Sequence, residues 1–253
     1  MKNSVITILI IFLLGACSPT PAPSPLPTET AIPPTSTATP TVIWFPPTAT
    51  LTPFPTRGVT PTVDMLPNIG QLIFEDDFSD ASAWSLSHTD VGSVALGKNE
   101  LTIAIGESAA YMFSVREQPI LADFYLEITA SPTLCRDLDE YGLLLRVSPS
   151  LDYYRFSLSC NGQVRLDRLY GGQASSPQPW VMSGAVPPGA PSTSRLGVWA
   201  VGPEMRFFVN GSYQFTVIEP VLASGGVGVF VRSTSDNAVT VNFSDLVVYD
   251  VTE

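Results

Sequence analysis

The chain has 253 residues, with 12 Lys and Arg against 23 Asp and Glu, and its formal net charge at pH 7 is −11. Binding of nucleic acid needs a basic face, so this charge argues against a nucleic acid partner, and it also disfavours direct adsorption to an anionic membrane. The region after residue 70, of about 180 residues, is long enough for one hydrophobic core and too short for two full domains.

The N-terminal segment has the organisation of an export signal. Lys2 precedes an almost entirely apolar run over Val5–Leu14, which is too short to span a bilayer but fits the apolar part of a signal peptide. The following Leu14-Gly15-Ala16-Cys17 resembles the lipobox of bacterial lipoproteins, in which the cysteine is acylated and the chain is cut just before it. The resemblance implies a signal peptide over 1–16 and a lipid on Cys17 that attaches the protein to the membrane, outside the cytoplasm, at the cell surface. The alternatives are a secreted protein cut near Ala16 or a short uncleaved anchor.

A Pro/Thr-rich segment follows the cysteine. Residues 18–67 contain 14 of the chain's 24 prolines and 13 threonines, and only three residues of the segment are charged. Such a composition cannot bury enough apolar surface to offset the entropy of ordering, and Pro-Thr pairs favour extended polyproline II. We therefore predict a disordered linker over 17–70 that carries a domain at 71–253.

The region 71–253 alternates apolar and polar residues in short runs separated by Gly, Pro, Asn and Asp, which is typical of β-strands. Asn161-Gly162 and Asn210-Gly211 are strong hairpin signals, because both residue types tolerate positive φ. So many strands at short spacing predict a sandwich or a barrel. The predicted strands are Gln71–Phe74, Val91–Leu96, Glu100–Ile105, Ala109–Val115, Ala122–Ala130, Tyr141–Ser148, Tyr153–Cys160, Gln163–Tyr170, Ser194–Val201, Glu204–Val209, Ser212–Ile218, Gly226–Ser233 and Ala238–Asp250.

The order of several motifs in this region resembles one superfamily. These motifs are Phe74–Phe78 with Trp84, Arg195–Val198, Glu204–Gly211, Gly225–Phe230 and Phe243–Tyr249. Their order is similar to that of the concanavalin A-like superfamily, particularly its laminin-G-like and keto-glycoside-hydrolase-like domains. The resemblance implies an all-β, two-sheet antiparallel jelly-roll sandwich, with a concave face that in relatives often binds sugar.

The run Tyr141–Cys160 predicts a hairpin with two different faces. Pairing Ser148 with Tyr153 places Cys160 opposite Tyr141 and puts alternate apolar residues of both strands on one continuous face. The other face carries Arg146 and Arg155 with small polar residues and Tyr153, which suits a solvent-exposed ligand face because guanidinium groups donate to hydroxyls and carboxylates. The alternative is a solvated outer face on which the two arginines pair with neighbouring acids.

The next turn conflicts with a two-residue Asn161-Gly162 loop. That loop would turn Arg165 and Asp167 toward the apolar face, whereas the sequence favours Val164 and Leu166 inside. A three-residue loop or a bulge shifts the alternation once and resolves the conflict. We therefore expect Arg165 and Asp167 to lie on the arginine face.

The sequence carries no recognisable catalytic group. His88 is the only histidine and no Gly-x-Ser-x-Gly motif occurs, which argues against a Ser-His-Asp hydrolase and leaves a His/Cys zinc site unsupported. Glycosidases of the superfamily carry Glu-x-Asp-x-x-Glu on a central strand; the nearest string, Glu75–Asp80, ends in Asp and lies on the first strand, so we reject it as a catalytic pair. The only cofactor that we consider is a structural Ca²⁺ on Asp76 or Asp77 with Asp245, the alternative being that these acids cap local N–H groups.

Cys135 and Cys160 are the two cysteines left once Cys17 is lipidated. Export permits a disulfide, and the predicted register places Cys160 at the open end of the hairpin, within reach of the loop that holds Cys135. We predict that the two are bridged, the alternative being two separate thiols.

These observations predict a membrane-anchored lipoprotein with a non-catalytic carbohydrate-binding domain. The expected partner is a glycan or a cell-surface polysaccharide, and the candidate ligand-binding residues are Arg146, Tyr153, Arg155, Tyr170 and Trp180. Two alternatives stay open: a structural or protein-binding surface module, which would show an apolar patch, and a glycoside-hydrolase-like enzyme, which would show two carboxylates about 5 to 10 Å apart in a cleft.

Overall fold

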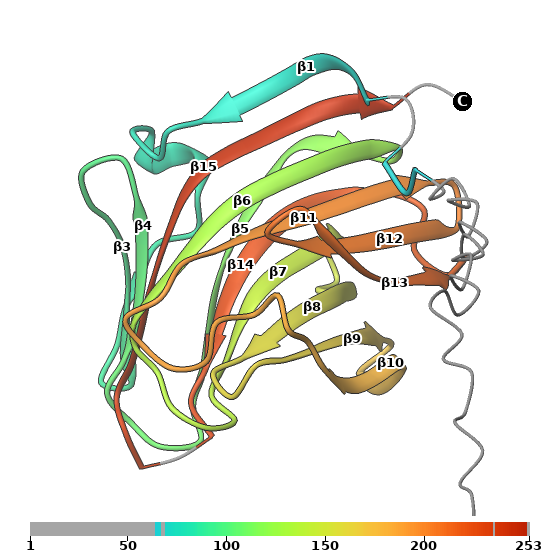
Figure 1. Ribbon diagram of the computed structural model, residues 1–253. Helices are drawn as coiled ribbons and strands as arrows, with labels where there is room; N and C mark the ends of the chain where they lie inside the picture. The colour runs from blue at the N-terminus through green and yellow to red at the C-terminus, as the bar shows by residue number, and fades with distance from the viewer. Residues whose placement is uncertain (1–63, 67–68, 235, 252–253) are drawn as a thin grey trace, which may run out of the picture. The chain divides into compact units, whose positions relative to one another are not determined.

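The computed structural model describes residues 64–66, 69–234 and 236–251 (Figure 1). Most of these residues form β-strands. The predictions for the signal peptide, for Cys17 and for most of the linker lie outside these residues. The elements are β1 (Ile69–Asp76), η1 (Ala81–Ala83, a 3-10 turn), β2 (Ser87–His88), β3 (Gly92–Leu96), β4 (Leu101–Ile105), β5 (Tyr111–Leu121), β6 (Phe124–Leu134), β7 (Glu140–Val147), β8 (Tyr153–Ser159), β9 (Gln163–Tyr170), β10 (Gln173–Met182), β11 (Ser194–Val201), β12 (Glu204–Val209), β13 (Ser212–Ile218), β14 (Gly225–Arg232) and β15 (Val239–Val251).

Two curved antiparallel sheets make up the fold (Figure 1). The nine-stranded sheet runs β13-β12-β11-β6-β15-β4-β3-β2, with β1 also paired to β15. The six-stranded sheet runs β10-β9-β8-β7-β14-β5. The protein is therefore the two-sheet antiparallel jelly-roll sandwich that the sequence predicts. No helix among the described residues is long and apolar enough to cross a membrane.

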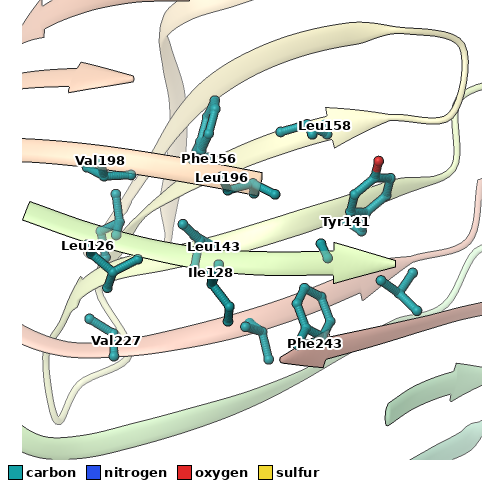
Figure 2. Close-up of a cluster of buried hydrophobic side chains, with 14 of the residues drawn as sticks. Leu126, Ile128, Tyr141, Leu143, Phe156, Leu158, Leu196, Val198, Val227 and Phe243 are labelled. Carbon is teal, nitrogen blue, oxygen red and sulfur yellow. The ribbon is translucent and has the colours of Figure 1, made fainter. Parts of the chain in front are cut away.

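The main core lies between the two sheets, where side chains of opposite sheets interdigitate (Figure 2). Phe156 of β8 packs on Phe207 of β12 with ring centroids 4.8 Å apart, and Phe207 packs on Phe215 of β13 at the same distance. Each large apolar side chain that is fully buried in this way stabilises the fold by about 1.5–3 kcal/mol. The period-2 alternation of apolar residues is therefore the cause of the two-layer arrangement.

Each predicted strand corresponds to a strand of the structure, although several boundaries differ by a few residues and β5 continues to Leu121. β2 and β10 were not predicted. β10 is rich in Ser and Gln and contains Pro177 and Pro179, residues that argue against a strand. It forms because it is an edge strand, where a proline has no second neighbour that needs its missing N–H.

The β7–β8 hairpin keeps the predicted faces, but its predicted register is wrong by two residues. Tyr141 pairs with Leu158 and Leu145 with Tyr154, so Cys160 lies beyond the paired residues. A shift of two leaves the inside and outside of each strand unchanged, because side chains repeat with period 2. The loop to β9 has three residues, and Val164 and Leu166 lie in the core as predicted.

Arg146 corrects the prediction of an exposed ligand-binding arginine. Its side chain is 0% exposed, and it donates hydrogen bonds to the carbonyl oxygens of Leu222, Ala122 and Gly202. The cause is a β-bulge: Arg146 has φ of 52°, and the pairing of β7 with β14 slips by one residue at this point. The extra residue turns Arg146 away from the face that alternation assigns to it, and burial lowers the pKa of its guanidinium.

Cys135 and Cys160 are joined by a disulfide, as predicted, with their Cα atoms 5.8 Å apart. The backbone N–H of Cys160 donates to the carbonyl of Asp139, which holds the loop after Cys135 against the end of β8. Among the first described residues, Met65 and Leu66 pack on an aromatic cluster of the nine-stranded sheet.

Candidate binding site

The outer face of the six-stranded sheet, turned away from the nine-stranded sheet, carries a second apolar cluster. Its side chains come from β5, β7, β8, β9 and β14, and we call it the outer aromatic cluster: Tyr111, Phe113, Val115, Leu144, Val147, Tyr153, Leu169 and Phe230. A strand with apolar residues on both faces is ordinarily covered on both faces. No third sheet of the described chain lies over the cluster, and the guanidinium of Arg155 lies over the rings of Tyr111 and Phe230.

Tyr111 lies across the outer aromatic cluster. Its hydroxyl is 3.3 Å from that of Tyr153, and its ring centroid is 5.7 Å from those of Phe113 and Phe230. Burial raises the pKa of Tyr111 far above its usual value, with the neighbouring Tyr153 adding to the effect. The ring therefore stays neutral and forms an apolar surface with a polar tip, which is the character of aromatic residues at binding sites.

A network of ion pairs continues from the cluster toward β9 and β10, and we call it the arginine network. Arg155 and Arg165 both bind one oxygen of Asp167, at 2.6 and 2.8 Å. Glu140 binds Arg165 at 3.2 Å through one oxygen and Arg232 at 3.3 Å through the other. Both carboxylates are 5% exposed, whereas the side chain of Arg232 is 44% exposed.

Aromatic rings flank the arginines of the network. Trp180 of β10 lies against the guanidinium of Arg165, 4.4 Å from ring centroid to Cζ, and Arg155 lies over the ring of Phe230 at 5.5 Å. Burial by itself lowers the pKa of Arg155, but the hydrogen bond and the charge of Asp167 outweigh it, and that pKa is raised. Arg155 is therefore a fixed, charged group beside aromatic rings.

The carboxylates of the arginine network are not arranged for glycoside hydrolysis. Asp167 accepts from Ser176 on one oxygen and from two arginines on the other, and both oxygens of Glu140 bind arginine. An acid and a nucleophile must each present a free oxygen to the scissile bond. Neither carboxylate does so, because guanidinium and hydroxyl groups occupy them.

A groove follows β5 at the edge of the same sheet. Three adjoining pockets of about 410, 370 and 160 Å³ share Ser85 and are lined by β5, by the segment 82–91 and by the loop 148–151; we call them together the β5 groove. Phe113 belongs to two of the pockets, and Tyr111 lines one of them. The exposed polar residues Glu117 and Gln118 line the pockets of about 410 and 160 Å³. The groove therefore adjoins the outer aromatic cluster and combines aromatic walls with hydrogen-bonding groups.

The structure brings three of the five predicted ligand residues onto one face. Arg155 lies in the arginine network and Trp180 beside it, while Tyr153 is on the same face but only 5% exposed. Tyr153 is thus packed under its neighbours and does not present a free stacking surface, which corrects the prediction that it is exposed. Tyr170 is 52% exposed at the end of β9, and Arg146 lies elsewhere.

Sequence reasoning missed the β5 groove. The available signal was that the alternate residues Tyr111, Phe113 and Val115 are aromatic or apolar although Met112 between them faces the core. The strand is therefore apolar on both faces. Arg232 and Glu140 were also missed, because they come from β14 and β7 and their pairing depends on the strand order. Arg165 and Asp167 lie on the outer face as expected.

The predicted calcium ligands each have local partners. Asp76 accepts from the indole N–H of Trp84 and pairs with Arg116, Asp77 accepts from Ser79, and Asp245 accepts from Ser244. Among the described residues, no group of three or more His, Cys, Asp or Glu side chains could hold a metal ion. Acids that cap local N–H and O–H groups make contacts of this kind, and the calcium site stays a prediction. His88 is exposed on the short strand β2.

No protein-family model matches the sequence, and no curated protein matches it either. Solved structures share its fold. A Bacillus subtilis protein of unknown function with a galectin-like fold aligns with a TM-score of 0.56 and 13% identity, over 73% of this chain and 99% of that one.

Two catalytic domains of laminarinases are similar in the same way. The endo-1,3-β-glucanase of Thermotoga petrophila aligns with a TM-score of 0.52 and 9% identity, over 74% of this chain and 100% of that domain. The laminarinase of Thermotoga maritima gives 0.53 and 10%, over 72% and 99%. At such identities the likeness shows a shared jelly-roll fold and carries no site residues over.

Proposed function

We propose that this chain is a lipid-anchored protein of the cell surface whose β-sandwich binds a glycan without cleaving it. The observation that carries the proposal is the β5 groove, in which the aromatic side chains of Tyr111 and Phe113 lie beside the polar groups of Ser85, Glu117 and Gln118. Sugar rings present apolar faces that pack on aromatic residues and hydroxyls that bond to such polar groups.

Two further points support this proposal. Glu140 and Asp167, the carboxylates of the arginine network, have both oxygens bound to arginine or serine side chains. The fold is also that of the laminarinase domains, which are named for their action on 1,3-β-glucan. Carboxylates that are occupied in this way favour holding a sugar chain over cleaving it.

A protein-binding surface is the second candidate. Apolar side chains are exposed along the β5 groove: Leu86 is 41% exposed, Ile120 55% and Leu151 51%. Exposed apolar residues gathered at one groove favour contact with a protein. The two functions differ in one respect that can be measured, since only the first predicts saturable binding of a purified sugar.

We expect the double substitution Glu117→Ala and Gln118→Ala to lower glycan affinity at least about tenfold, since each removes groups that bond to sugar hydroxyls, a loss of about 1.4 kcal/mol of binding energy. Both residues are exposed, so stability should change by no more than about 0.5 kcal/mol for each. The measurement is a glycan array with the full-length protein, followed by titration calorimetry on the glycans that bind.

The matched control is Glu107→Ala with Ser108→Ala, an exposed acidic and polar pair outside the groove. It should bind as the original chain does. Absence of binding to every glycan of the array, together with a correctly folded protein, would contradict the proposal and favour the protein-binding alternative.

The anchor has its own test. We expect labelled palmitate to enter the expressed protein, and the Cys17→Ser variant to lose the label, keep its full length and leave the membrane fraction. The reason is that the thioether-linked lipid requires the cysteine sulfur, and several acyl chains hold a protein far better than one. Palmitate labelling that persists in Cys17→Ser would rule out this site of attachment.

A further inference from the structure

The arginine network contains more cations than anions. Its ion pairs join Arg155, Arg165 and Arg232 to only two carboxylates, Glu140 and Asp167. The whole chain carries a net charge of −11 and has only 12 basic residues. Three of these are thus gathered on one face of an acidic protein, and the three arginines and two carboxylates of the network sum to one positive charge.

The surplus charge is accessible at one end of the network. Asp167 is held closely, at 2.6 and 2.8 Å, whereas the two contacts of Glu140 are 3.2 and 3.3 Å. Charge-assisted N–H···O bonds are ordinarily 2.7–2.9 Å long. Arg232 is also 44% exposed and makes only one of the ion pairs, so its guanidinium, with five N–H donors, has several free for a ligand.

Buried donors on the same face lack acceptors. The Nε atoms of Arg155 and Arg165 and the hydroxyl of Ser157 are buried and have no hydrogen-bond partner among the described residues. Ser157 is fully buried and pairs across the sheet with Arg165, so it lies beside that arginine. An unsatisfied buried donor destabilises the fold, and a hydrogen bond to a bridging water removes that cost. The three atoms lie beneath the arginine face, and a bridging water would join them to a ligand that is rich in acceptors.

We infer that the glycan is acidic and that Arg232 and Arg165 bind the carboxylate of a uronic acid residue. This inference rests on the proposed function and adds the chemical class of the ligand. A guanidinium group binds a carboxylate with two parallel N–H···O bonds, which a neutral sugar cannot accept in the same way. The neutral part of the sugar chain would then extend from the arginine network along the outer aromatic cluster to the β5 groove.

The test compares acidic sugars with neutral sugars of the same shape. Titration calorimetry with the full-length protein in detergent micelles uses oligogalacturonate and oligoglucuronate, each beside its methyl ester, and neutral laminarihexaose. We expect at least one acid to bind at least about tenfold more tightly than its own ester, and this preference to decrease as salt rises from 50 to 300 mM, because exposed charges are screened.

Arg232→Gln should remove the preference for the acid and leave the affinity for the ester unchanged. Arg206→Gln is the matched control, since Arg206 also pairs with one glutamate, Glu204, but lies on the nine-stranded sheet. Equal affinity for acid and ester, or binding of laminarihexaose alone, would overturn the inference while leaving glycan binding intact. Binding of neither acid would also overturn it, and the glycan array then decides whether the proposed function falls as well.

Discussion

The Arg146→Ala variant is expected to unfold with a free energy about 3 kcal/mol lower than that of the original chain. The guanidinium supplies hydrogen bonds to three carbonyl oxygens, those of Leu222, Ala122 and Gly202, at 2.8–2.9 Å. Each buried acceptor that loses its donor costs about 1–3 kcal/mol. A pocket of about 230 Å³ beside Arg146 admits water to the site, which keeps the expected loss at the low end of the combined cost.

Urea denaturation of the full-length protein measures this loss. Arg146→Lys should recover only part of the stability, because a compact ammonium group cannot reach three carbonyls from one position. The control is Arg168→Ala, since Arg168 forms a partly exposed ion pair with Glu219 and should contribute no more than about 1 kcal/mol. A decrease in unfolding free energy below about 0.5 kcal/mol in Arg146→Ala would show that the three hydrogen bonds are not needed for stability.

The double variant Cys135→Ala and Cys160→Ala should lose about 3–4 kcal/mol of unfolding free energy. The bridge closes a loop of 25 residues, and the chain-entropy model assigns this gain to the restriction of the unfolded state. Alanine is preferred to serine because both cysteines lie in the core, at 6% and 3% exposure, where a hydroxyl would be buried without a designed partner. Urea denaturation again gives the measurement.

Reduction of the original protein should reproduce the same loss, because it removes the bridge without changing the sequence. Thiol alkylation of the unreduced protein, with peptide mapping, provides the independent check. Alkylation at both Cys135 and Cys160 in the absence of reductant would contradict the disulfide.

The difference between successful and failed sequence predictions is visible in the β7–β8–β9 meander. The inside and outside of β8 and the three-residue loop at Asn161-Gly162 were predictable, because the alternation of Tyr154, Phe156 and Leu158 with polar residues is a local property. The register of the first hairpin was not, since a shift of two residues preserves both faces.

The bulge at Arg146 shows a second limit. An arginine in an alternating run reads as an outward, solvated residue, and nothing adjacent to it in sequence reveals that Ala122, Gly202 and Leu222 leave three carbonyls to be satisfied. Those carbonyls come from three separate segments of the chain. The cost of leaving them unpaired, which is a tertiary effect, outweighs the local alternation.

The sequence by itself determined the fold class, the strands of the core, the pairing of Cys135 with Cys160 and the face that carries Arg155, Arg165 and Asp167. These features follow from period-2 alternation, turn residues and cysteine number, which are local or compositional. Only the tertiary structure decided that Arg232 and Glu140 join the arginine network, that Tyr153 is buried and that a groove follows β5. The physical reason is that these contacts join strands that are distant in the chain, so they depend on strand order and on the packing of one side chain over another.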